Sequence, residues 1–227
     1  MAVLASSIIS KAQIIAQDTT GVRWPFAELL GWLNDAQREL AIYKPSATAT
    51  NAVLQLKQGT LQDIGDGGLQ LLSITRNLKS GATDIREGGR AIRKVERLVL
   101  DAQHPQWHDS TVFAYTTEVK HFCFDPIDPT RFYVFPGNTG AGYVEAIISR
   151  APADLAVTGD ANLLGSYATP IGVPDVYSNA LLDYVLYRAY AKDADYAGNA
   201  DRSTQHYQAF MASVSTKAQN EQSGVSG

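Results

Sequence analysis

The sequence is poor in cysteine and histidine, with one cysteine and four histidines among 227 residues. Because Cys123 has no second cysteine to pair with, an intramolecular disulfide is excluded. The residue lies in the apolar run of residues 121–124, His-Phe-Cys-Phe. This setting predicts a buried, inert thiol and not a reactive nucleophile.

Long hydrophobic runs are missing as well, since no stretch reaches about 18 consecutive apolar residues. Residues 2–15 are interrupted by serine, lysine and glutamine, without a basic start or a continuous apolar stretch. We therefore expect neither a membrane span nor a secretory signal.

Motifs of common enzyme chemistries are also missing. The glycine-rich residues 65–68 are not followed by Gly-Lys-Ser/Thr, and no G-x-S-x-G sequence occurs. His104 and His108 have i, i+4 spacing, but Pro105 disfavours the helix that a shared metal site needs. We interpret this segment as a polar turn that Trp107 anchors in the core. The sequence predicts no catalytic, cofactor-binding or metal-binding residues.

Three aspartates, Asp125, Asp128 and Asp160, remain as candidate carboxylates for hydrolysis or cation binding. Two of them stand beside prolines in a turn, where aspartate is favoured because its side chain accepts backbone hydrogen bonds. We interpret them as turn residues. A small metal-dependent hydrolase using His104, His108, His121 and Asp125 stays an alternative.

Charge is nearly balanced, with a net charge of −4 from 19 basic and 23 acidic residues. Eight acidic and four basic residues follow Ala151, so the C-terminal part carries the whole excess. This balance argues against a protein that mainly grips phosphate backbones. One basic cluster has acidic neighbours and no aromatic residues, which indicates a solvated or partner-facing surface. It consists of Arg86, Arg90, Arg93, Lys94 and Arg97.

Helical periodicity marks both ends of the chain. The apolar spacing predicts one amphipathic helix ending near Gln17 and a second over residues 26–43, which we expect to pack as an antiparallel hairpin. After Pro174 a helix that is apolar around most of its circumference is expected, followed by a last helix over residues 201–219. Such an apolar helix is central to a bundle or lies in a subunit interface.

The middle of the chain changes from a period of 3.6 toward a period of 2, with glycine-rich turn signals. This pattern predicts a β-rich insertion with a short helix over residues 96–103. The expected strands are residues 52–57, 69–77, 90–95, 112–118, 121–124, 131–135 and 143–150.

Together these patterns predict an α+β fold, in which N- and C-terminal helices form a four-helix bundle and a β-rich subdomain is inserted between them. The expected parts are an N-terminal helical hairpin (1–50), the β-rich subdomain (51–150), a long connection (151–172), the C-terminal helices (173–220) and a flexible tail (221–227).

Tyrosines gather in the last third of the chain. A tyrosine combines large contact area with a hydroxyl group that tolerates water, which suits a subunit interface, although core packing explains these residues equally well. The expected interface residues are Tyr177, Tyr184, Tyr187, Arg188 and Tyr190.

Three segments resemble the head-to-tail adaptor (connector) proteins of tailed bacteriophages. They are residues 32–41 (WLNDAQRELA) with the following Lys44-Pro45, residues 174–194 (PDVYSNALLDY with YRAYAKDA), and residues 205–210 (QHYQAF). The likeness covers the four helices and their order, about half of the chain, and the β insertion matches it only in position and character.

This resemblance implies a structural virion protein and not an enzyme. It implies a ring, commonly of twelve copies, that lies under the portal protein at the head-tail junction and contacts a downstream tail or nozzle protein. DNA would pass through the channel without specific binding, and assembly would take place in the host cytoplasm without a membrane or cofactor. The C-terminal segment would bind the portal. The residues expected there are Lys217, Gln219, Asn220, Glu221 and Gln222.

A second phage module, such as a tail-completion or minor capsid protein, has a similar composition. It differs in the particle component that it binds, and the hydrolase alternative differs in holding a metal.

Overall fold

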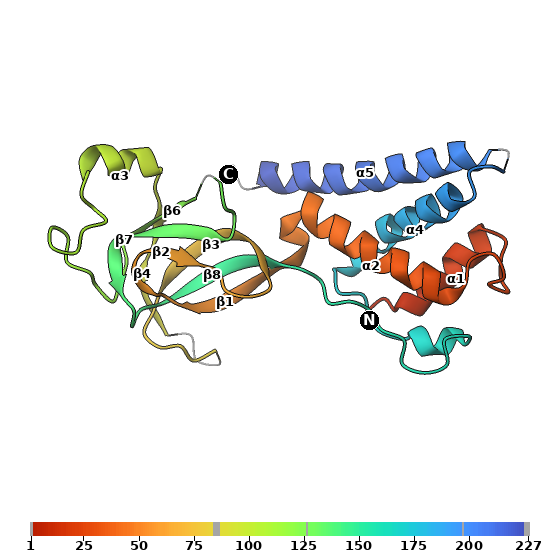
Figure 1. Ribbon diagram of the computed structural model, residues 1–227, viewed down its shortest axis with the longest axis horizontal. Coiled ribbons are helices and arrows are strands. Elements are labelled where there is room, and N and C mark those ends of the chain that lie inside the picture. The colour runs from red at the N-terminus through yellow and green to blue at the C-terminus, as the bar shows by residue number, and fades with distance from the viewer. Residues whose placement is uncertain (1, 84–86, 126, 197, 225–227) are drawn as a thin grey trace. The chain divides into compact units, whose positions relative to one another are not determined.

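The computed structural model describes residues 2–83, 87–125, 127–196 and 198–224, with side-chain surroundings up to residue 215. Within these residues the chain is α+β, with five α-helices and two four-stranded sheets (Figure 1). It forms two compact units, one from Met1–Ala47 with Pro152–Gly227 and one from Thr48–Ala151. We name them the helical unit and the β unit. The α+β class predicted from the periodicity is confirmed.

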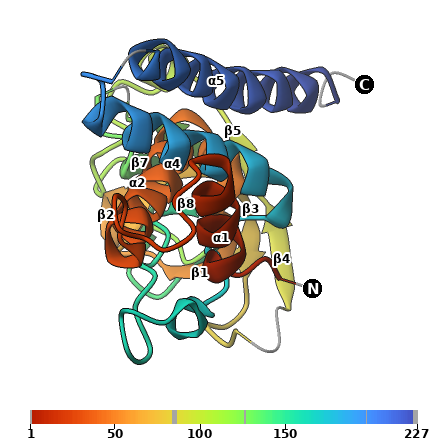
Figure 2. The ribbon, with the colours of Figure 1, turned by 90° about the vertical axis from the view of Figure 1, so that its right-hand side faces the viewer.

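The helical unit contains α1 (Ala5–Ile15), α2 (Phe26–Tyr43), α4 (Ser178–Lys192) and α5 (Asn199–Gly224). Helix α4 contacts the three other helices and lies between α5 and the pair α1 and α2 (Figure 2). Its apolar residues are buried accordingly, with Leu181 and Val185 fully covered. Since a helix that is apolar around its circumference needs neighbours on several sides, this central place follows from its sequence.

Asp18 organises the turn that leads into α2. Its carboxylate accepts hydrogen bonds from the backbone N–H groups of Val22 (3.1 Å), Arg23 (2.9 Å) and Trp24 (2.8 Å). The Trp24 indole then donates to the Ala189 carbonyl of α4 at 3.2 Å. The helix begins directly after Pro25, a residue whose missing N–H costs little at this position.

The long connection after Ala151 is held to the helical unit by hydrogen bonds between α2 side chains and its backbone. The Asn34 amide accepts from the Leu155 N–H (2.8 Å) and donates to the Leu155 carbonyl (3.1 Å). Gln37 accepts from the Gly172 N–H at 2.6 Å. The irregular backbone is thereby satisfied. Short 3₁₀ turns lie in and beside this stretch and before the β unit: Leu164–Tyr167, Asp175–Tyr177 and Pro45–Thr48.

The β unit contains two sheets. In the first the strand order is β1 (Ala49–Gln55), β8 (Tyr143–Arg150), β3 (Gly68–Leu78) and β4 (Gly88–Ala91). The second has the order β2 (Gln58–Asp63), β7 (Arg131–Thr139), β6 (His121–Phe124) and β5 (Arg93–Lys94). All neighbours are antiparallel except β5 and β6, which are parallel.

Strand β7 of the second sheet is covered on both faces, because successive side chains of a strand point to opposite sides. Phe132 and Val134 of β7 join a core with residues of β3 and β8. Tyr133 and Phe135 point to the opposite face, where α3 (Arg97–Gln103) and Trp107 cover them. Trp107 is completely buried, which confirms its expected anchoring role.

Several predicted elements were wrong in detail. Residues 112–118 are not a strand, because Asp109 closes turns with Thr111 and Phe113, and Asn138 donates to the Thr116 and Thr117 carbonyls. Strand β2 was not predicted. Helix α5 runs to Gly224, beyond the predicted end at residue 219 and into the segment expected to be a flexible tail, of which residues 225–227 lie outside the described part.

None of the described helices combines the length and apolar character needed to cross a membrane.

Candidate functional site

Three of the five predicted interface residues lie in the core of the helical unit. Tyr177, Tyr184 and Tyr190 are 4%, 6% and 5% exposed. The Tyr184 ring packs edge-on against Phe210, with ring centres 5.2 Å apart. These side chains stabilise the unit itself and leave little area for a neighbour, so core packing explains them. Tyr187 and Arg188 are half-buried, and an interface role for these two stays a prediction.

A different set of tyrosines reaches the surface where α2, α4 and α5 meet. We define the tyrosine surface as Tyr43, Tyr187, Tyr207 and Glu39. The rings of Tyr187 and Tyr207 lie 4.9 Å apart, and Tyr43 is 44% exposed. A hydrogen bond between the side chains of Tyr207 and Tyr43, together with burial and the Glu39 charge, raises the pKa of Tyr207 to about 12. The Tyr207 hydroxyl group therefore stays protonated at physiological pH and serves as a hydrogen-bonding group.

This surface combines tyrosine rings with the Glu39 carboxylate, which forms no ion pair with the described residues. Tyrosine-rich, partly wet surfaces are typical of protein interfaces. The sequence placed Tyr187 among the expected interface residues but gave no such role to Tyr43. The available signal was its place as the last residue of α2, directly before Lys44-Pro45.

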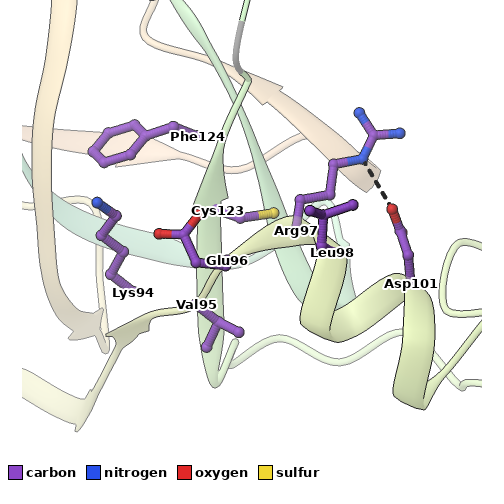
Figure 3. A pocket seen from close by; sticks show the side chains of 8 residues that line it. All are labelled: Lys94, Val95, Glu96, Arg97, Leu98, Asp101, Cys123 and Phe124. Carbon is purple, nitrogen blue, oxygen red and sulfur yellow. Dashed lines mark ion pairs between the residues drawn. The ribbon is translucent and has the colours of Figure 1, made fainter.

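The β unit carries an open groove of about 550 Å³ (Figure 3). Its apolar residues are Val95, Leu98, Cys123 and Phe124, and Leu98 is 80% exposed. Charged side chains surround them: Arg97 pairs with Asp101 at 3.6 Å, and the Lys94 ammonium lies 5.0 Å from the Phe124 ring centre. An apolar floor with a charged rim is the composition of a docking surface. The Cys123 thiol is buried, as predicted, and burial raises its pKa to about 11.

Beside this groove, exposed basic side chains come from strand β4 of the first sheet, strand β5 of the second sheet and the residue before β6. We define the basic edge as Arg90, Arg93 and Lys120. All three are exposed, and none forms an ion pair with a residue in the described ranges. The pKa of His121 is lowered, mainly by burial and further by the positive charges of these three residues. Arg86, which the sequence placed in the same cluster, lies outside the described residues.

The histidines do not come together. His104 follows the last residue of α3 and stacks on Phe135, with ring centres 5.4 Å apart. His108 Nδ1 lies 2.7 Å from the Thr60 hydroxyl. Among the residues described, no three histidine, cysteine, aspartate or glutamate side chains are grouped so that they could hold a metal ion.

The three candidate aspartates close turns. Asp125 accepts from the Ile127 N–H at 2.9 Å, Asp128 from the Thr130 N–H at 2.9 Å, and Asp160 from the Asn162 N–H at 2.9 Å. Backbone hydrogen bonds from Ile127 and Asp128 lower the pKa of Asp125. The interpretation of these residues as turn aspartates is confirmed.

The residues predicted to bind a portal lie in the last part of α5. The backbone of Lys217, Gln219, Asn220, Glu221 and Gln222 is helical, and their side chains lie outside the described part. Their role stays a prediction.

Comparison with known proteins gives a family match. A search of curated proteins found no match. Residues 4–226 match the model of a family described as SU10 adaptor protein. This match spans both units, including the β insertion, and confirms the resemblance seen in the helices. The chain is therefore a bacteriophage adaptor, and it belongs to the SU10 adaptor protein family.

Proposed function

We propose that this adaptor forms a homo-oligomeric ring, of twelve copies in the particle, under the portal protein at the head-tail junction. There it joins the capsid to the tail and continues the DNA channel. The family match over residues 4–226 carries this proposal, because an adaptor associates with other virion proteins through its surface.

The contacts within the helical unit support a role as the rigid part of each subunit. Helices α1, α2, α4 and α5 bury a shared core, from Ile8 and Leu33 to Leu181 and Phe210. We propose that they act as one four-helix bundle that holds the tyrosine surface in a fixed shape. Rigid elements keep an interface preorganised, which lowers the entropic cost of association.

Charge supports a channel through which DNA slides. The net charge of −4 resides entirely in the segment after Ala151, which belongs to the helical unit. An acidic wall repels phosphate, whereas a basic wall would retain it. The adaptor would thus lie near packaged DNA without binding it specifically.

For the portal contact we propose the end of α5, with Lys217, Gln219, Asn220, Glu221 and Gln222. The helix spans 26 residues, whereas its partner helix α4 spans 15. Amphipathic or polar helical ends that dock into a groove are a common recognition mode. The opposite partner would be a tail or nozzle protein, contacted during assembly in the host cytoplasm.

We propose a purely structural role without catalysis. The runner-up function is another virion module, a tail-completion or minor capsid protein, and a small metal-dependent hydrolase ranks below it. The groove of Figure 3 favours docking over hydrolysis, because its thiol is buried and one of its two carboxylates, Asp101, is paired with Arg97.

Co-sedimentation of the full chain with assembled portal rings from the same phage tests the proposal. We expect one adaptor per portal subunit in the heavy fraction. Sedimentation with isolated tails and not with portals would instead identify a tail-completion protein. Metal retained by the purified chain, together with hydrolytic activity, would support the enzyme.

A further inference from the structure

We propose that the basic edge of one copy docks on the tyrosine surface of the next copy. Arg90, Arg93 and Lys120 of the β unit would meet Glu39 and the rings of Tyr43, Tyr187 and Tyr207 in the neighbouring helical unit. This inference rests on the proposed ring and names the two surfaces that close it.

Among the described residues, none of the three side chains of the basic edge forms an ion pair, although Glu87 and Glu118 lie near them. Arg93 lies in β5, which pairs with β6 through residues Arg93–His121 and Lys94–Phe122 on one side only. The Arg93 N–H donates to the Lys120 carbonyl at 3.1 Å, so both side chains start from adjacent backbone. Like charges gathered without an acidic partner repel one another, and a carboxylate brought to them gains favourable electrostatic energy.

The tyrosine surface offers the complementary chemistry. Glu39 supplies the carboxylate, and its negative charge acts on both Tyr207 and Tyr184. Tyrosine rings attract guanidinium groups through their negative faces. The chain uses this contact internally: Arg97 lies 5.0 Å from the Tyr133 ring centre, and Arg23 lies 4.9 Å from that of Tyr196.

Two different, complementary patches on one chain are what a head-to-tail contact requires. Such heterologous contacts generate closed rings when the rotation between subunits closes, whereas self-complementary patches give twofold dimers. DNA is the less favoured partner of the basic edge. The β unit has as many acidic as basic residues, and Glu87 and Glu118 lie near the edge, where Glu87 pairs with Lys79.

Charge reversal tests the pairing in the full chain. We expect Arg93→Glu to weaken subunit association about tenfold or more, and Arg90→Glu/Arg93→Glu to weaken it further. Glu39→Arg should weaken it similarly, and the double variant Arg93→Glu/Glu39→Arg should regain most of the affinity. Lys11→Glu, an exposed change of the same charge on α1, is the matched control and should assemble like the wild type. Sedimentation at several protein concentrations measures the association, and thermal melting checks the fold.

The outcomes separate the two proposals. A wild-type chain that stays monomeric with and without portal rings would contradict the ring itself. A ring that Arg93→Glu leaves unchanged, or a double variant that assembles no better than either single one, would overturn only the pairing. If Arg93→Glu assembled normally but lost affinity for a short DNA duplex, the basic edge would be assigned to nucleic acid instead.

Discussion

At the scale of single residues, Asp18 shows how much one side chain contributes to local structure. It is 9% exposed and accepts three backbone hydrogen bonds in the turn before α2. Asp18→Ala leaves these N–H groups without their acceptor, and we expect the free energy of unfolding to fall by about 1–3 kcal/mol. Chemical denaturation measures this loss. Asp195→Ala, at an exposed position, should change stability by less than about 0.5 kcal/mol.

Leu33 and Ile42 provide a matched pair on α2. Leu33 is fully buried in the helical core, whereas Ile42 is 67% exposed. Leu33→Asp places a charge in this core and should lower the free energy of unfolding by about 3–5 kcal/mol. Ile42→Asp should have little effect. Equal melting temperatures for wild type and Leu33→Asp would contradict the packing of α2.

Cys123 should resist thiol reagents in the folded protein. Its side chain is 1% exposed and burial raises its pKa to about 11, so very little thiolate is present or accessible at neutral pH. We expect labelling by a thiol reagent to follow global unfolding, with fast reaction in denaturant as the positive control. Rapid labelling of the native protein would contradict this prediction, because it would show that the Cys123 thiol is accessible without unfolding.

Residue roles could be predicted where the local sequence determines them. Trp107, Cys123 and Asp125 lie in short patterns whose packing or turn chemistry depends on close neighbours in the chain. The tyrosines of α4 were harder to assign. Tyr184 and Tyr190 suit either a core or an interface, and only the packing of α5 and α2 on α4 decides that they are buried.

At the scale of elements, strands with apolar alternation were predictable and polar ones were not. Residues 143–150 were predicted and form β8. Strand β2 was not predicted, because its buried residues, Thr60 and Gln62, are polar and give no apolar alternation. The Gln62 amide is satisfied by the carbonyls of Lys57 (2.9 Å) and Gly59 (3.1 Å), a compensation that no periodicity reveals.

The end of α5 separates folding from partner binding. Val214 is the last described residue of α5 that is buried in the helical core. Deleting residues 219–227 should therefore leave the melting temperature within a few degrees of the wild type and weaken portal binding. Circular dichroism and co-sedimentation measure the two effects. Unchanged portal binding would remove this segment from the proposed contact.

At the scale of the whole molecule, the succession of a helical part, a β-rich part and a second helical part was predictable, because the hydrophobic period changes from helical to β-like and back. The place of α4 followed from its apolar circumference. The tyrosine surface was not predictable, because it combines residues of α2, α4 and α5 that lie far apart in the sequence. The basic edge likewise combines Arg90 of β4, Arg93 of β5 and Lys120, which directly precedes β6.

The most direct test of the adaptor ring is native mass spectrometry of the purified chain, alone and mixed with portal rings from the same phage. We predict that the mass of the portal ring increases by one adaptor chain per portal subunit, which is twelve chains on a twelve-subunit portal. A chain that remains a free monomer in the presence of the portal would contradict the account.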